Sequence, residues 1–379
     1  MYKIMTPGPT QVLENVRRAR SIECTNPDLD TTFCEFYKET CELISELLYT
    51  KNETLILCGE GILGLEAACA SLTEPGDNVL VLDNGLYGKG FADFVTMYGG
   101  NPTLYSTDYK NTIDVQALEA YLQKHHDFKY ATVVHCDTPS GMLNEISRIC
   151  PLLKKYGIMT VVDSVSAMFG EAVRVDEDQI DVLCGGSQKA VSAPPGLCFV
   201  TISHAAKKAM QGRRIPIASF YANLMMFDGY YEKKWFPYTM SISDIYGLRV
   251  AFDNIKEDHT MLDRHAAVAV ATRKAIQEAG LTLYQESGFA NTVTVFEVPD
   301  GVVAEDILEG MKTKHNILLA GSFGEFAGKV IRIGHMGTNA TMSNMLETLV
   351  ALEEVLSSLG VSLQTNMTET FLREWKKVQ

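Results

Sequence analysis

Two neighbouring segments decide the fold of the chain, Val161-Val-Asp163-Ser-Val-Ser166 and Gly185-Gly-Ser-Gln-Lys189-Ala-Val-Ser-Ala-Pro-Pro-Gly196. Asp163 ends one apolar run that predicts a buried strand, and Lys189 follows the next such run after a glycine turn. In open α/β folds, ligands bind at the edge of the sheet where the parallel strands have their carboxyl ends. We therefore expect both side chains to lie at that edge.

Short apolar runs alternate with amphipathic stretches from residue 52 to residue 203, which is typical of a mostly parallel, buried sheet with helices on both faces. The expected strands are 54–58, 78–82, 131–135, 159–163, 181–184 and 197–202. A helix-forming stretch from Ile245 to Ala279, closed by Gly280, is long enough to bridge two domains.

The pattern of expected elements changes in the C-terminal third. Strands at 292–298 and 329–333 and an apolar helix face from Met345 to Leu359 predict a smaller α+β unit there. We therefore expect an N-terminal arm (1–20), a large domain (21–255) that carries the ligand site at the sheet edge, and a small C-terminal domain (256–379).

Composition places this chain of 379 residues among soluble globular proteins, because 46% of its residues are hydrophobic and 21% are charged. A formal net charge of -14 disfavours nucleic acids and anionic membrane surfaces as partners. The nine cysteines form no Cys-x-x-Cys pair and are expected to be free thiols. We see no signal peptide and no membrane span, and we expect a cytoplasmic location.

An acid and a lysine at neighbouring strand ends are the pair that a pyridoxal phosphate site requires. The lysine forms a Schiff base with the aldehyde of the cofactor, and the acid keeps the pyridine nitrogen protonated so that the ring accepts electrons. Taken singly, Asp163 is typical of a helix N-cap and Lys189 of a solvated loop cation. The two together, in this order, favour a pyridoxal phosphate enzyme.

A glycine turn supports the same interpretation. The stretch Cys58-Gly-Glu-Gly61-Ile-Leu-Gly64 joins a strand to an apolar helix, whose first-turn amides form an anion site suited to a phosphate. The glycines at 59, 61 and 64 also match the pattern of a dinucleotide fold, with Asp83 at the end of the next strand. An NAD(P)-dependent oxidoreductase is therefore the alternative, although it leaves Asp163 and Lys189 without a role.

Several motifs, spread over nearly the whole chain, resemble those of class V aminotransferases. They are Thr6-Pro-Gly-Pro9, Asn84-Gly-Leu-Tyr-Gly88, Asp163-Ser-Val165, Gly186-Ser-Gln-Lys-Ala-Val-Ser-Ala-Pro-Pro-Gly196 and Arg332-Ile-Gly-His-Met-Gly337. The chain is similar to the branch of alanine:glyoxylate and serine:pyruvate aminotransferases. This resemblance implies fold-type I, with a large domain on a mostly parallel seven-stranded sheet flanked by helices and a smaller α+β C-terminal domain. It also implies a homodimer whose active site lies at the subunit interface.

The resemblance further implies roles for individual residues. Lys189 corresponds to the Schiff-base lysine, Asp163 to the partner of the pyridine nitrogen, and Arg332 to the arginine that binds the substrate α-carboxylate. The other cofactor-binding residues it implies are Gly61 and Ile62 through their amides, Tyr87 by stacking on the ring, Thr138, Gln188, and Thr239 from the other subunit. Tyr87 has an alternative interpretation as an ordinary turn aromatic.

The chain departs from that branch at three positions, where Glu60 replaces a serine, Ile62 a histidine and Phe236 a tyrosine. Fewer polar groups then hold a phosphate. At an effective dielectric near 20, a carboxylate costs a second anion about 6 Å away roughly 3 kcal/mol. If Glu60 contacts the substrate, it favours small neutral donors over dicarboxylates and phosphonate amines. The alternative is that Glu60 points to solvent or to a basic residue and merely fills the turn.

We therefore predict a pyridoxal-phosphate-dependent transaminase that moves the amino group of a small α-amino acid, of the alanine or serine type, to a 2-oxo acid such as pyruvate or glyoxylate. Besides the oxidoreductase, the alternatives are a 2-aminoethylphosphonate:pyruvate-type transaminase and a catalytically silent relative that keeps the fold as a binding protein. His135, at a strand end, is expected to pack rather than to catalyse. No cluster has metal-ligand spacing, so we expect no metal site.

Overall fold

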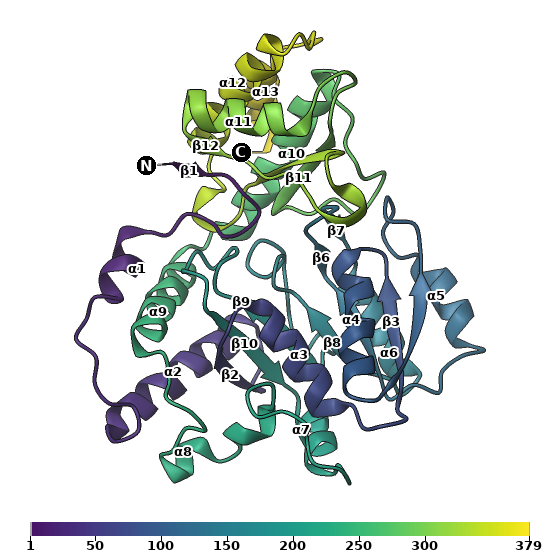
Figure 1. Ribbon diagram of the computed structural model, residues 1–379, viewed down its shortest axis with the longest axis vertical. Coiled ribbons are helices and arrows are strands. Elements are labelled where there is room, and N and C mark those ends of the chain that lie inside the picture. The colour runs from purple at the N-terminus through teal and green to yellow at the C-terminus, as the bar shows by residue number, and fades with distance from the viewer. Residues whose placement is uncertain (1, 379) are drawn as a thin grey trace.

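The centre of the protein is a seven-stranded sheet with the strand order β2-β10-β9-β8-β5-β3-β4 (Figure 1). The computed structural model describes residues 2–378. In sheet order the strands are β2 (Glu53–Cys58), β10 (Leu197–Ile202), β9 (Val182–Gly186), β8 (Met159–Asp163), β5 (Tyr130–Val134), β3 (Asn78–Asp83) and β4 (Asn101–Ser106). Strand β10 runs antiparallel to both of its neighbours, and the other pairings in the sheet are parallel. The predicted fold class is confirmed.

The apolar runs predict six of the seven strands, including the edge strand β2, whose four central residues are buried. Strands β5, β9 and β10 are buried along their whole length. The sequence does not predict β4, whose residues are half-buried or exposed. It lies at the edge of the sheet, where Pro102 is tolerated because a proline has no N–H to donate to a second neighbour.

Helices pack against this sheet. Helix α3 (Gly61–Leu72) lies against β9 and β10, and α4 (Leu86–Met97) lies beside it against β3, β4 and β5. Helix α3 is apolar around most of its circumference, because α4 and α7 (His204–Gln211) cover the sides that the sheet leaves open. The other helices of this part are α1 (Glu14–Ala19), α2 (Thr31–Leu47), α5 (Val115–Leu122), α6 (Ile146–Lys155), α7 (His204–Gln211), η1 (Leu224–Phe227), α8 (Tyr230–Lys233) and α9 (Ile242–Glu257).

The C-terminal part is a smaller α+β unit, as predicted. Its elements are α10 (Met261–Glu278), β11 (Val293–Glu297), α11 (Ala304–His315), β12 (Ile317–Leu318), η2 (Gly324–Phe326), β13 (Val330–Gly334), η3 (Gly337–Asn339), α12 (Met342–Ser358) and α13 (Met367–Val378). Strands β11 and β13 pair antiparallel, and β1 (Lys3–Ile4) joins this unit by pairing with β12. A separate ladder of β6 (Cys136–Asp137) and β7 (Met142–Leu143) lies near it (Figure 1).

The expectation of one continuous helix from Ile245 to Ala279 is wrong. The structure contains α9 and α10 instead, separated at 258–260. The Asp258 carboxylate accepts hydrogen bonds from the amide and the hydroxyl of Thr260, at 3.2 and 2.8 Å, and pairs with Arg264, so it holds the turn that starts the second helix. Helix α10 ends at Glu278 with Ala279 as its C-cap, and Gly280, with a φ of +88°, lies at the C′ position as predicted.

Two large hydrophobic cores lie on either side of this break. One contains buried side chains between Val16 and Met261 together with Met336, and the other contains Met5 and buried side chains between Val268 and Phe371. These cores support the division into an arm (1–20), a large domain (21–255) and a small domain (256–379), which stays a prediction.

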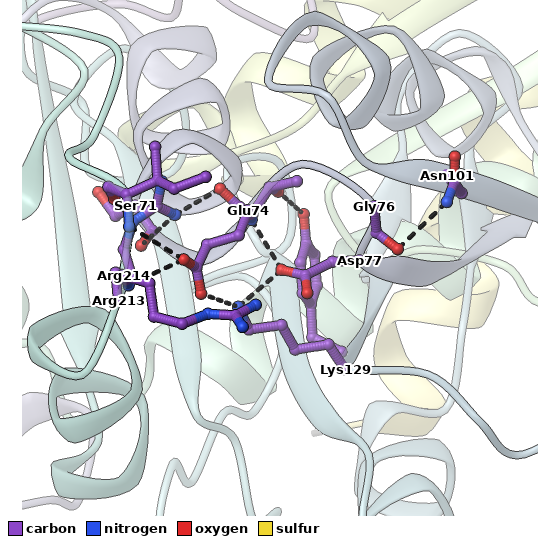
Figure 2. A network of polar contacts seen from close by, with 11 residues as sticks. Ser71, Glu74, Gly76, Asp77, Asn101, Lys129, Arg213 and Arg214 are labelled. Atoms are coloured by element: carbon purple, nitrogen blue, oxygen red, sulfur yellow. Dashed lines mark hydrogen bonds and ion pairs between the residues drawn. The ribbon is translucent and has the colours of Figure 1, made fainter.

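A polar network fixes the segment after α7 to the end of α3 that lies far from the glycine turn (Figure 2). Glu74 accepts a hydrogen bond of 2.9 Å from the Arg214 amide, and this bond helps to lower the pKa of the Glu74 carboxyl. Lys129 lies 2.6 Å from Asp77 and 3.6 Å from Glu74. The network thereby anchors the start of the long segment that leads to Thr239.

Within residues 2–378, no helix is long and apolar enough to cross a bilayer, and no group of three or more His, Cys, Asp or Glu side chains could hold a metal ion. The nine cysteines are free thiols, and seven of them are buried.

Candidate active site

A cavity of about 200 Å³ lies at the edge of the sheet where β2, β8 and β9 have their carboxyl ends. It is lined by Gly8, Pro9, Glu60, Gly61, Ile62, Leu65, Tyr87, Thr138, Asp163, Val165, Ser166, Gln188 and Lys189. Eight of the ten predicted site residues are in this set, and the other two are Arg332 and Thr239. A larger surface hollow, of about 940 Å³, lies beside the amino end of β2 and contains none of the predicted site residues.

Lys189 follows β9 in a tight turn, and the Thr10 hydroxyl donates to its carbonyl oxygen at 2.9 Å. Its side-chain amine donates a hydrogen bond of 2.7 Å to the carbonyl oxygen of Pro7. Burial disfavours the charged ammonium, and the nearby cation Arg332 adds to this, so the pKa of Lys189 falls to about 8. About one tenth of the amine is therefore neutral and nucleophilic at pH 7, far more than for a lysine with its ordinary pKa.

Asp163 is the last residue of β8, and its side chain accepts a hydrogen bond of 2.9 Å from the Val165 amide. Burial raises the pKa of Asp163 to about 7, although this hydrogen bond opposes the shift. Asp137, also buried, contributes to the rise. A buried carboxyl in this state gains from a cationic N–H partner placed beside it, because such a partner stabilises the ionised form.

The glycine turn between β2 and α3 has a geometry that the sequence leaves open. Glu60 Oε1 accepts a hydrogen bond of 3.1 Å from the Ile62 amide, and Oε2 accepts one of 3.0 Å from Gln188 Nε2. Glu60 therefore caps α3 beside the cavity and makes contact with a neutral amide rather than with a basic residue. A Cβ at Gly61 would lie 2.8 Å from the Val165 side chain, so a larger residue does not fit there.

The geometry around Asp83 disfavours a dinucleotide site. Its carboxylate accepts hydrogen bonds from the hydroxyls of Ser106, at 2.8 Å, and Tyr109, at 2.6 Å, and the side chain is buried. Gly64 faces the sheet, because a Cβ there would lie 3.3 Å from Val200. This part of the glycine pattern therefore serves helix–sheet packing.

Tyr87 and Thr138 line the cavity from neighbouring loops. The Tyr87 amide, in the first turn of α4, donates to Asp137 Oδ1 at 2.8 Å, and a Cβ at Gly85 would collide with Asp137. Burial raises the pKa of the half-buried Tyr87 hydroxyl, so it stays neutral. The Thr138 and Ser166 hydroxyls lie 3.2 Å apart.

Arg332 lies in the middle of β13 and is largely buried. Its guanidinium donates 2.6 and 3.3 Å hydrogen bonds to the carbonyl oxygens of Gly321 and Thr138. Among residues 2–378 it has no carboxylate within ion-pair distance. Burial lowers the pKa of Arg332, and nearby Tyr87 and Asp137 only partly oppose this. An anionic ligand would complete its interactions.

Two residues that the resemblance connects with a second subunit lie outside the cavity. Thr239 donates a 3.3 Å hydrogen bond to Asp28. Phe236, at the position where a tyrosine is usual, is buried in an aromatic cluster with Phe33, Tyr37 and Tyr230.

Sequence reasoning assigned no role to Gly8, Asp137 and Val165, all of which contact or support the cavity. The Thr6-Pro-Gly-Pro9 motif is the signal that could have identified Gly8, because an unusual proline and glycine pattern often marks a special backbone shape. His135 packs as expected: it is buried, lies 3.0 Å from Ser164 Oγ, and burial lowers its pKa to about 3.

The combination of a buried amine with a lowered pKa and a carboxyl ready for a cationic partner is the chemistry of a pyridoxal phosphate enzyme. A class V aminotransferase family model matches residues 6–342. Pyridoxamine–pyruvate transaminase from Mesorhizobium japonicum is 32% identical over 95% of this chain and 92% of its own length. Alanine–glyoxylate aminotransferase from Callithrix jacchus is 30% identical over 93% and 87%.

Solved structures agree with the sequence relatives. Ureidoglycine–glyoxylate aminotransferase from Bacillus subtilis superposes with a TM-score of 0.95 at 29% identity, over 99% of this chain and 98% of that one. Pyridoxamine–pyruvate aminotransferase from Mesorhizobium loti gives a TM-score of 0.95 at 31% identity, over 99% and 97%. The chain belongs to the class V aminotransferase family. It is a pyridoxal-phosphate-dependent aminotransferase, and the NAD(P)-dependent alternative is set aside.

The cavity fits the two parts of this cofactor unequally. An amine, a buried carboxyl and an aromatic ring suit the aldehyde and the pyridine, and they are supplied by Lys189, Asp163 and Tyr87. At the position expected to hold the phosphate, the Ile62 amide and the Gln188 side-chain N–H already donate to Glu60. The ring therefore fits, and the phosphate meets a carboxylate that competes for its donors.

Proposed function

We propose that the protein transfers the amino group of a small α-amino acid, of the alanine or serine type, to a 2-oxo acid such as pyruvate or glyoxylate. The observation that carries this proposal is the buried Lys189 amine, held by the Pro7 carbonyl in one cavity with Asp163. The names of the relatives, which pair alanine or ureidoglycine with glyoxylate and pyridoxamine with pyruvate, support the same class of substrates.

In this proposal Lys189 and Asp163 are the catalytic residues. When bound, pyridoxal phosphate supplies an electron-withdrawing ring that stabilises the negative charge left when the substrate loses its α-proton. Lys189, with its pKa near 8, takes up that proton and returns it at the neighbouring carbon. Asp163 accepts a hydrogen bond from the ring nitrogen and so keeps that nitrogen protonated.

Other residues bind and orient. Arg332 binds the substrate carboxylate through its planar fork, and Tyr87 stacks on the ring. The remaining contacts to the ring and its substituent come from Thr138, Gln188 and the Gly61 and Ile62 amides, with Thr239 from a second copy of the chain. Glu60 contacts either the substituent of the ring or the amino-acid substrate.

We infer a homodimer with a shared active site, in the cytoplasm. Thr239 lies outside the cavity of its own chain, on the segment that the Glu74 network anchors, which supports a role in the site of a second copy. Large apolar side chains on the same long segment are exposed, among them Ile215 at 47%, Tyr221 at 54% and Trp235 at 50%. Sedimentation of the purified protein as a single 379-residue chain would contradict the dimer.

A second candidate donor is phosphate-free pyridoxamine, with pyruvate as the acceptor, as the name of one relative states. The observation that favours it is the Glu60 carboxylate on the Ile62 amide. The same carboxylate disfavours 2-aminoethylphosphonate, whose phosphonate is a second anion.

Trapping at Lys189 tests the proposed function. The protein is incubated with pyridoxal or its phosphate, reduced with borohydride and digested, and the peptide that carries the added mass is identified. We expect the adduct on Lys189, and we expect Lys189→Ala to fold normally and to lose about 100-fold or more in transamination rate. An adduct spread over surface lysines, or near-normal turnover by Lys189→Ala, would refute the assignment.

A further inference from the structure

The position expected to bind a phosphate is rich in hydrogen-bond acceptors. Both side-chain oxygens of Glu60 lie there, one 3.1 Å from the Ile62 amide and the other 3.0 Å from Gln188 Nε2. The amide of Leu63 donates to the main-chain oxygen of Glu60, at 2.9 Å. Two amides of the first turn of α3 are therefore already used by Glu60 itself, and a phosphate would have to displace its carboxylate.

Gln188 adds an independent observation. The residue is 7% exposed, and its Oε1 atom is buried with no hydrogen-bond partner among residues 2–378. Turning the amide over would bring this oxygen against the Glu60 carboxylate, so the orientation with Nε2 toward Glu60 is the favourable one. A buried acceptor without a partner costs about 1–3 kcal/mol, and a ligand that donates a hydrogen bond removes this cost.

The charges around the cavity agree with this requirement. The ionisable side chains among its lining residues include the carboxylates of Glu60 and Asp163 and a single amine, that of Lys189. A phosphate ester brings a charge of about −1.5 to −2 and no permanent donor. A hydroxymethyl group brings no charge and one O–H donor, and its oxygen can still accept a hydrogen bond.

We propose that Glu60 and Gln188 make this position specific for a hydroxyl group, so that the phosphate-free ring of pyridoxal and pyridoxamine binds in preference to its phosphate ester and exchanges as a substrate. The inference rests on the proposed function, because it needs Lys189 and Asp163 to hold the ring. It makes Glu60 the residue that decides which form of the ring the protein uses.

The reaction is balanced without a further reactant. The nitrogen of pyridoxamine bonds to the keto carbon of pyruvate, and the keto oxygen leaves as water. Lys189 takes a proton from the methylene carbon of pyridoxamine and delivers it to the former keto carbon. Water then adds to the methylene carbon and breaks its bond to nitrogen, which gives pyridoxal and alanine. Pyridoxamine loses two electrons and pyruvate gains them.

Binding measurements test the proposal without relying on turnover. The purified protein is freed of bound ligand by treatment with excess pyruvate or alanine and gel filtration, and is then titrated with pyridoxal and with pyridoxal phosphate. The readouts are the absorbance of the Schiff base and the mass added to Lys189 after borohydride. We expect pyridoxal to bind more tightly than its phosphate by about tenfold or more, a factor reduced from the full Coulomb value because Glu60 is solvent-exposed.

Two variants identify the residue responsible. Glu60→Gln removes the charge at constant size, and Glu60→Ser keeps a side chain that can cap α3. Both should improve phosphate-ester binding relative to pyridoxal by about tenfold. Glu66→Gln is the matched control, because Glu66 lies on the same helix and accepts a 2.6 Å hydrogen bond from Tyr98 outside the cavity.

The outcomes separate the inference from the proposed function. Tighter binding of pyridoxal phosphate than of pyridoxal by the unmodified protein, or an unchanged preference in both Glu60 variants, overturns the inference and leaves the transaminase proposal standing. Failure of both compounds to form an adduct at Lys189 overturns both.

Discussion

Replacing Gly8 by alanine tests whether the N-terminal segment is part of the active site. Gly8 has a φ of +108°, and an added Cβ would lie 2.5 Å from Cδ and 2.7 Å from both Cε and Nζ of Lys189. Ordinary carbon contacts are about 3.5–4.0 Å, so the lysine side chain or the 7–9 backbone must move by about 1 Å. The neighbouring Pro7 carbonyl would then lose its 2.7 Å hydrogen bond from Nζ.

The expected cost differs between folding and chemistry. The unfavourable backbone conformation costs about 1–3 kcal/mol of folding free energy, and the end of a lysine side chain can shift at little further cost. A reacting nitrogen displaced by about 1 Å, however, lowers the rate by roughly 100-fold. We therefore expect Gly8→Ala to reduce the transamination rate far more than its stability loss explains.

Gly76→Ala provides the matched control. Gly76 has a φ of +89°, and a Cβ there would meet no atom within 4 Å, so this variant carries the backbone strain without a contact to Lys189. Urea unfolding measures the stability of both variants, and single-turnover absorbance measures formation of the Lys189 adduct. If Gly8→Ala and Gly76→Ala lose stability equally and form the adduct at the same rate, the reasoning about Pro7, Gly8 and Lys189 is wrong.

Three further predictions concern Arg332, Lys189 and Asp137. Arg332→Lys keeps the charge but loses the planar fork, so the affinity for the amino acid should fall by about 1.5–3 kcal/mol while absorbance titration shows unchanged ring binding; equal affinity of the unmodified protein for alanine and alaninamide would contradict this. Lys189 reacts as the neutral amine and its pKa is lowered to about 8, so the rate of pyridoxal capture, followed by stopped-flow absorbance, should rise as the pH increases through about 8 and then level off; a flat profile across that range would exclude Lys189 as the nucleophile. Asp137→Ala leaves the Tyr87 amide without its acceptor and leaves the Ser140 hydroxyl with only the main-chain oxygen of residue 137, so urea unfolding should show a loss of about 1–3 kcal/mol together with weaker ring binding; weaker ring binding without any loss of stability would contradict this structural explanation.

The features that the sequence predicts best are those that local pattern determines. A strand buried on both faces requires a continuous apolar run, so β8 and the polar residue at its end, Asp163, could be recognised directly. The edge strand β4 carries no such run, because none of its residues is buried. The break between α9 and α10 depends on the capping contacts of a single side chain, Asp258. Polar residues of this kind also occur inside continuous helices, so the sequence alone does not show that the helix stops there.

The sequence does not predict the contacts in the site between residues that are distant along the chain. Gly8 and Lys189 meet because β1 joins the C-terminal unit and carries the following residues over the sheet edge. The sequence leaves two orientations open for Glu60, and the choice between them depends on the Gln188 amide, which arrives from a different strand end. Neither contact changes the local pattern at either position, so no periodicity or motif reports it.

The site separates its two ligands by the polarity of their hydrogen bonds. Asp163, with its pKa raised to about 7 by burial, gains from a cationic N–H donor, and the unpartnered Gln188 oxygen gains from a hydrogen-bond donor rather than from a further acceptor. A ring with a protonated pyridine nitrogen and a hydroxymethyl group donates at both positions, whereas the ionised phosphate ester of that ring donates only from the nitrogen. Arg332 has the opposite requirement, because its guanidinium is bound only to carbonyl oxygens within the described chain. A carboxylate satisfies it, and the acceptors around the ring repel that carboxylate, so each ligand is directed to its own half of the site.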